Sequence, residues 1–131
     1  MRSDPETATT RPRSFEELQV WKRSMELAEL VHRLTRQFPR EEIFGLAGQL
    51  RRAATSIPSN IAEGFGRINL REFRSFLLIA RGSKCELQTQ LKISKPLEYG
   101  SRESLDKAMA LSDETGRRLF SLLEKLRAKL D

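Results

Sequence analysis

The sequence predicts an all-α protein, an antiparallel up-down-up-down four-helix bundle. Apolar residues recur at spacings of three and four in four separate segments, and no segment shows the alternation typical of a β-strand. Short stretches with Pro or Gly join the segments, which favours antiparallel neighbours. We expect the bundle domain to span residues 14–131, after a disordered N-terminal tail over residues 1–13 that has almost nothing apolar to bury.

The first predicted helix begins at Ser14 and ends near Gln37, before Pro39. We expect a capping box at its start, in which Ser14 and Glu17 each accept a hydrogen bond from the other's backbone amide. Its apolar residues form two seams on nearly opposite sides, whereas a helix of a monomeric bundle needs only one. The second seam therefore predicts a partner outside the bundle. The first seam is Leu18, Trp21, Met25 and Ala28; the second is Val20, Leu27, Val31, Leu34 and Phe38.

The second predicted helix begins between Glu42 and Leu46 and continues through Pro58, because its apolar spacing does not change there. Pro58 lacks a backbone donor and its ring clashes with the Ala54 carbonyl, so we expect a kink. The apolar residues that keep this spacing are Leu46, Leu50, Ala53, Ala54, Ile57, Ile61 and Phe65.

Polar residues and glycines follow the proline in the stretch SIPSNIAEGFGR. We expect Asn60 and Glu63 to serve the bend or a neighbouring subunit. Gly64 or Gly66 is expected to end the helix in the left-handed conformation. This glycine pair is not a phosphate loop, because no strand precedes it and its spacing is wrong.

Asn69, with Glu72, is predicted to cap the third helix, and Pro96 to end that helix near Lys95 or to kink it. Ser101 is predicted to cap the last helix. The expected core stripe of the third helix is Phe73, Phe76, Leu77, Ala80, Ser83, Leu87 and Leu91, with Ala80, Gly82 and Ser83 small enough for a close helix contact. The expected core stripe of the last helix is Leu105, Ala108, Met109, Ser112, Thr115, Leu119, Leu122, Leu126 and Leu130.

Composition is typical of a soluble cytoplasmic protein. Of the 131 residues, 32% are charged, and no stretch has the roughly 20 uncharged apolar residues of a membrane span. The first residues lack the apolar core of a secretory signal. Cys85 is the only cysteine, so an internal disulfide is excluded and a reducing cytoplasm is expected.

Positive charge is the most informative functional feature. The net charge is +6, and Arg, which suits phosphate contacts, supplies 17 of the 24 basic residues. Two interpretations stay open: a solvated face with local Glu partners, or a surface that binds nucleic-acid phosphates. The candidate nucleic-acid-binding residues are Arg51 and Arg52 of the second helix, Arg67 of the following loop, and Arg71, Arg74, Arg81 and Lys92 of the third helix.

Aromatic residues that could stack on bases are few: Tyr99, Phe15 and Trp21, of which Trp21 is expected in the core. The sequence predicts no enzyme, metal site or cofactor. His32 is interpreted as a lone surface histidine, and Cys85, with no histidine to activate it, as a small core or interfacial residue. The pairs Glu16–Glu17 and Glu41–Glu42 lie where helices begin, and there they stabilise the helix dipole.

Three stretches resemble the bacterial four-helix bundle proteins of the 23S rRNA intervening-sequence family: FEELQVWKRSMELAELVHRLTRQFP, GLAGQLRRAATSIPSNIAEGFGR and FRSFLLIARGSKCELQTQL. The resemblance implies a left-handed antiparallel bundle that assembles as a ring-shaped homopentamer. A related branch comprises the accessory variability proteins of diversity-generating retroelements, which bind a reverse transcriptase and nucleic acid. Pro96 departs from the family pattern, which usually keeps an unbroken helix there.

Two functional hypotheses follow. In the first, the chain is a non-enzymatic oligomeric scaffold, a pentamer, that binds structured RNA or DNA beside a reverse transcriptase or a ribosomal partner. In the alternative, it is a structural or protein–protein interaction oligomer with no nucleic-acid role, and its arginines serve solubility and intersubunit ion pairs.

Overall fold

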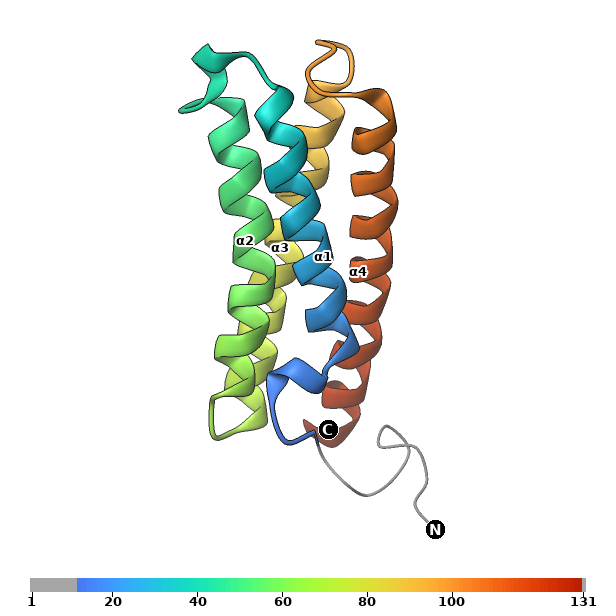
Figure 1. Cartoon of the computed structure of the whole chain (residues 1–131). Helices are drawn as coiled ribbons and strands as arrows, with labels where there is room; N and C mark the ends of the chain where they lie inside the picture. The colour runs from blue at the N-terminus through green and yellow to red at the C-terminus, as the bar shows by residue number, and fades with distance from the viewer. Residues whose placement is uncertain (1–11, 131) are drawn as a thin grey trace.

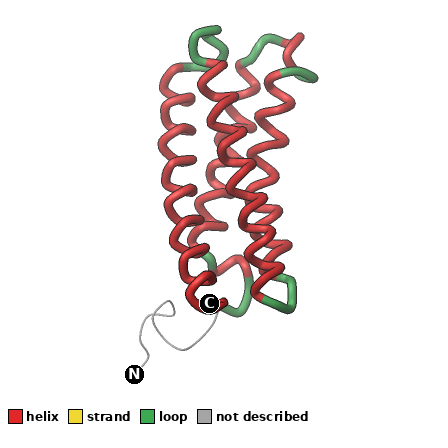
Figure 2. Tube along the Cα trace, turned by 180° about the vertical axis from the view of Figure 1, so that it is seen from behind, coloured by secondary structure: helices red, strands yellow, loops and turns green. Residues whose placement is uncertain are grey.

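The structure, a computed structural model, describes residues 12–130 and contains four long helices packed side by side (Figure 1). They are α1 (Gln19–Leu34), α2 (Leu46–Phe65), α3 (Leu70–Ser94) and α4 (Arg102–Leu130). Consecutive helices run in opposite directions, and α1 packs on α4 to close the bundle. The described residues form helices and loops and no strand (Figure 2). The predicted all-α four-helix bundle is therefore confirmed, while most of the predicted tail, residues 1–11, lies outside the described residues.

All four helices contribute to one core. The second seam of α1 is buried, whereas Leu18, Trp21 and Met25 of the first seam are half-buried. In α4 Leu123 is buried, whereas the predicted Leu122 is half-buried and packs against the core. None of the helices within residues 12–130 has both the length and the apolar character needed to cross a bilayer. The largest fully buried apolar side chains are Leu27, Leu34, Leu50, Ile57, Ile61, Leu77, Leu87, Leu91 and Leu119.

The start of the first helix differs from the prediction. Phe15–Glu17 is a separate 3₁₀ helix, and an extended residue divides it from α1. Ser14 accepts a hydrogen bond from the amide of Glu16 (3.0 Å), while the Glu17 carboxylate accepts one from the amide of Arg13 (3.1 Å). The expected capping box is therefore wrong, because the tighter 3₁₀ turn brings an earlier amide to the serine.

The helix α2 continues through Pro58, as its apolar spacing predicts. The Asn60 side chain donates hydrogen bonds to the carbonyl (2.8 Å) and the hydroxyl (2.9 Å) of Ser56. That hydroxyl lies 2.8 Å from the hydroxyl of Ser83 on α3. The polar residues around the proline thus bond within α2 and between α2 and α3.

The predicted left-handed glycine cap of α2 is wrong. Gly66, the residue after Phe65, has right-handed backbone angles (φ −75°, ψ −6°). Gly64 is buried inside the helix, where an added Cβ would lie 2.7 Å from Cβ of Phe76, so it allows α2 and α3 to approach closely. Gly82, which was expected to do this, faces open space.

The last two helices are capped by the predicted residues, but the reciprocal half of the box at Asn69 differs, because the Glu72 carboxylate accepts a hydrogen bond from the Asn69 side chain (3.3 Å). Asn69 accepts a hydrogen bond from the amide of Glu72 (2.8 Å), and Ser101 accepts one from an amide in the first turn of α4 (3.1 Å). The helix α3 ends at Ser94, two residues before Pro96, so this proline does not interrupt it.

The α3–α4 loop is joined to the α1–α2 connection at one end of the bundle. The backbone amide of Ser101 donates to the Gln37 side chain (2.8 Å), and the Tyr99 ring lies 5.4 Å from the Phe38 ring. The Tyr99 hydroxyl donates to Glu42 (3.3 Å). These contacts hold the two helix pairs together at this end.

Candidate nucleic-acid interface

Four predicted binding residues lie along α3: Arg71, Arg74, Arg81 and Lys92. All four are exposed, because helical spacing turns them away from the buried stripe that begins at Phe73. Within residues 12–130, none of them forms an ion pair with a carboxylate. We call these four residues the α3 basic strip. At 1.5 Å per residue the strip is about 30 Å long.

Arg67, in the loop before α3, is surrounded by carboxylates. Its guanidinium nitrogens lie 2.8 Å from Glu63 and 3.8 Å from Glu72, and the group lies over the Phe76 ring, 4.8 Å from its centroid. The charge of Arg67 is therefore compensated locally, as expected for a solvated residue with Glu partners.

Arg51 and Arg52 of α2 have different surroundings. Arg51 is half-buried, and its Nε donates to the Thr35 hydroxyl (2.8 Å) at the end of α1. Arg52 is exposed and lines a groove between α2 and α3. Consecutive helix positions differ by about 100°, so the two arginines face different neighbours. The structure does not gather them with the α3 basic strip.

The groove beside Arg52 has a volume of about 420 Å³ and a polar lining. Its Gln90 side chain is buried, and the Oε1 atom of Gln90 has no hydrogen-bond partner among the described residues. The amide nitrogen of Gln90 makes one long hydrogen bond, 3.5 Å, to Gln49. The groove lining contains hydrogen-bond donors and acceptors and no aromatic residue.

Two cations outside the predicted set, Lys84 and Arg117, lie beside the strip, in a hollow between α3 and α4. Lys84 of α3 extends across Gly116 of α4, where an added Cβ would be 2.9 Å from the lysine Cε. Arg117 is the next residue of α4 and is exposed. The hollow has a volume of about 470 Å³ and is lined by Lys84, Asp113, Gly116, Arg117, Phe120 and Ser121.

Arg81 of the strip lies on the same side of α3 as this hollow. It precedes Lys84 by one helical turn and Gln88 by two, and the Gln88 side chain donates to Asp113 of α4 (2.8 Å). Lys84 and Arg117, like the strip, form no ion pair with a carboxylate of residues 12–130. Helical spacing alone could have indicated Lys84, but only the packing of α4 on α3 places Arg117 beside it.

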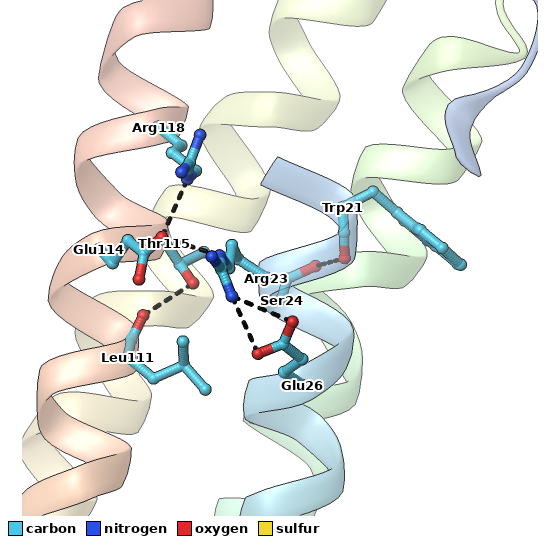
Figure 3. Close-up of polar contacts among 8 residues, drawn as sticks. All are labelled: Trp21, Arg23, Ser24, Glu26, Leu111, Glu114, Thr115 and Arg118. Carbon is cyan, nitrogen blue, oxygen red and sulfur yellow. Dashed lines mark hydrogen bonds and ion pairs between the residues drawn. The ribbon is translucent and has the colours of Figure 1, made fainter. Parts of the chain in front are cut away.

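The cations between α1 and α4, by contrast, are paired (Figure 3). The Glu114 carboxylate lies 2.8 Å from Arg23 of α1 and 3.1 Å from Arg118 of its own helix. Arg23 also pairs with Glu26 at 3.1 Å. This chain of alternating charges joins the two helices, so its arginines serve the bundle.

The aromatic residues that the sequence offered for stacking are engaged in the fold. Phe15 and Trp21 are half-buried and pack edge to face, with ring centroids 5.2 Å apart. Tyr99 packs on Phe38 and donates to Glu42, and desolvation together with the Glu42 carboxylate raises its pKa above the ordinary value of 10.0. Among the described residues, the aromatic side chains that are exposed are Phe44 (92%) and Phe120 (59%).

The histidine and the cysteine of the chain do not lie together in one site. His32 is exposed, and its Nε2 lies 3.1 Å from the Thr55 hydroxyl. Cys85 is exposed on α3, so the interpretation as a core residue is wrong and that as an interfacial residue stays a prediction. Within residues 12–130 no group of three or more His, Cys, Asp or Glu residues is placed to hold a metal ion.

Comparisons with known proteins agree with the fold. Residues 16–121 match the family model described as 23S rRNA-intervening sequence protein. A comparison with curated proteins gives no match. Among solved structures, the chain is similar to a protein with unknown function from the S23 ribosomal protein family of Bacteroides thetaiotaomicron, with 27% identity and a TM-score of 0.74. The similarity covers 80% of this chain and 95% of that chain.

Proposed function

Because this chain belongs to the 23S rRNA-intervening sequence protein family, we propose that it is a non-enzymatic oligomeric scaffold that binds structured RNA or DNA. The observation that carries the proposal is the α3 basic strip, whose cations are exposed and lack carboxylate partners among the described residues. Duplex DNA presents one negative charge about every 1.7 Å, so a strip of about 30 Å can meet several phosphates. Such contacts supply affinity and salt dependence but little sequence discrimination.

We further propose that the scaffold is a ring-shaped homopentamer in the cytoplasm, beside a reverse transcriptase or a ribosomal partner. The half-buried residues Leu18, just before α1, and Trp21 and Met25 of α1 support an intersubunit contact, because the bundle covers them only in part. Five copies carry a charge of about +30, which strengthens attraction to a polyanion. Sedimentation should give an oligomer; a 15.1 kDa monomer at micromolar concentration would contradict this proposal.

A bend of α2 at Pro58 is part of the same proposal. The proline removes one backbone hydrogen bond, and a bend relieves the clash of its ring with the preceding turn. The hydrogen bonds of Asn60 to Ser56 support the bend, because they add polar contacts on the turn that contains the proline. A bent α2 follows the bundle core and helps to shape the subunit for a ring.

Charge reversal tests the binding surface. Arg71→Glu, Arg74→Glu and Arg81→Glu combined should abolish the retention of RNA and DNA in mobility shifts, while helicity and assembly stay intact. The matched control reverses three exposed cations away from α3 and from the proposed intersubunit face, Arg40, Arg102 and Lys107, and changes the net charge equally. It should retain most of the binding.

The salt dependence separates this function from the alternative. For the parent protein, the logarithm of the binding constant should fall steeply with the logarithm of salt concentration, by about 0.9 for each duplex phosphate contacted. If the parent and the Arg71, Arg74 and Arg81 variant bind alike, the surface is misplaced. If the parent retains neither RNA nor DNA at low salt, the interaction oligomer without a nucleic-acid role is the better description.

A further inference from the structure

We propose that the hollow between α3 and α4 binds an unpaired base of a single-stranded nucleic acid, which stacks on Phe120 while Lys84 and Arg117 contact the flanking phosphates. This inference rests on the proposed function and names the form of nucleic acid that the surface prefers. It uses three residues outside the predicted binding set.

Phe120 is an unusual side chain in this bundle. Its exposed fraction is 59%, although it lies in the middle of a long helix and next to the buried Leu119. The aromatic residues of the other three helices, α1, α2 and α3, are buried or half-buried. Among the described residues only Phe44 is a more exposed aromatic, and it lies in the α1–α2 connection, outside the hollow. Phe120 thus presents an accessible ring on a rigid element.

The hollow is open to solvent and has room for a base. Its volume of about 470 Å³ falls within the range of about 300–1,000 Å³ that is usual for small-molecule sites. Gly116, one turn before Phe120, leaves room on α4, and the Lys84 stem occupies part of that room. A larger residue at position 116 would displace the lysine. The glycine therefore brings an ammonium group and an aromatic ring to the same hollow.

The charge around Phe120 suits a polyanion. Lys84 and Arg117 line the hollow, and Arg81 lies one turn from Lys84; none of the three pairs with a carboxylate of residues 12–130. Asp113 is the one carboxylate in the lining, and the Gln88 amide already donates to it. The hollow continues the positive surface of the α3 basic strip.

An exposed aromatic ring beside cations distinguishes single strands from duplexes. Every base has a π face that can stack on an aromatic side chain, and the phosphates on each side can contact Lys or Arg. In a duplex the bases are stacked on one another, so no base face is accessible for stacking on the Phe120 ring. The α3 basic strip alone makes no such distinction.

The test compares labelled poly-U 12-mers with a duplex of the same length by fluorescence anisotropy. Loss of a stacked base typically weakens binding about 5- to 150-fold, so Phe120→Ala should weaken single-strand binding within that range and leave duplex binding unchanged. Phe120→Trp should retain binding, and Phe120→Leu, which is apolar but not aromatic, should not. Phe44→Ala is the matched control and should bind like the parent.

The phosphate contacts have their own readout. Lys84→Ala and Arg117→Ala should each lower the slope of log affinity against log salt by about 0.7 for single strands, whereas Phe120→Ala should leave that slope unchanged.

Three results would overturn the inference. If Phe120→Ala binds the single strand like the parent while the Arg71, Arg74 and Arg81 charge reversal removes binding, the inference fails and the proposed function stands. If Phe120→Ala dissociates the oligomer in sedimentation, the hollow contacts a second copy and not a base. If the parent protein binds neither probe at low salt, the proposed function fails and the inference fails with it.

Discussion

The Tyr99 hydroxyl donates a hydrogen bond of 3.3 Å to Oε2 of Glu42, and the other oxygen of the same carboxylate accepts one of 2.9 Å from the amide of Leu46. One carboxylate therefore connects the α3–α4 loop to the first residue of α2. Because the amides at a helix start have no partner within the helix, Glu42 stabilises α2 while it anchors Tyr99.

The pH dependence of stability should reveal this contact. Desolvation and the Glu42 carboxylate raise the pKa of Tyr99 above 10.0, so the folded protein holds the phenolic proton more tightly than the unfolded chain. The resulting stability is fully present below pH 10 and is lost as the pH rises through the folded pKa. Tyr99→Phe should lose less free energy of unfolding above pH 10 than the parent does.

Phenolate absorbance measures the same titration directly, because Tyr99 is the only tyrosine of the chain. In the folded protein the absorbance midpoint should lie above the midpoint in denaturant. Equal midpoints would show that the hydrogen bond to Glu42 does not persist in solution.

Gly64 and Gly82 should respond to alanine in opposite directions. At Gly64 the new Cβ would lie 2.7 Å from Cβ of Phe76 and 3.2 Å from the Phe73 carbonyl oxygen, so overpacking should cost about 1–3 kcal/mol. Gly82 faces open space, so Gly82→Ala should stabilise the exposed helix by about 0.5–1 kcal/mol. Urea unfolding of both variants measures the difference, and destabilisation by Gly82→Ala would show that the outer face of α3 is covered.

Glu114→Gln should destabilise the bundle modestly, because the carboxylate pairs with Arg23 on α1 and Arg118 on α4. Partly exposed pairs contribute about 0.2–1 kcal/mol each and are screened by salt. The loss should therefore be measurable at low ionic strength and smaller in 1 M NaCl. Glu124→Gln, which removes a longer pair (3.7 Å) within α4, is the control and should be nearly neutral.

Pro58→Ala should keep or raise the helicity of α2, because it restores one backbone donor within the helix. Pro58 is buried, so loss of its ring should also alter packing and the oligomer size. Far-UV circular dichroism and sedimentation measure the two effects. Lower helicity in the variant would contradict this prediction and show that Pro58 stabilises the helical conformation of α2.

The sequence alone determined the fold class, the number of helices and most of the core. These features depend on local periodicity: Leu50, Ile57 and Ile61 recur at helical spacing, and they are fully buried in the structure. The caps at Asn69 and Ser101 were also predictable, because a cap involves residues only three apart. The cap of the first helix was not, since its residues form a 3₁₀ turn that the same pattern allows.

Only the tertiary structure decided which charges are compensated and which residues share a surface. Arg23 and Glu114 pair across α1 and α4, and Lys84 lies over Gly116 and lines the same hollow as Phe120. Such contacts depend on how far each helix is rotated about its axis and how it is shifted along its neighbour. Helical spacing places a residue on a face of its own helix, whereas the packing of the shared core determines what that face meets.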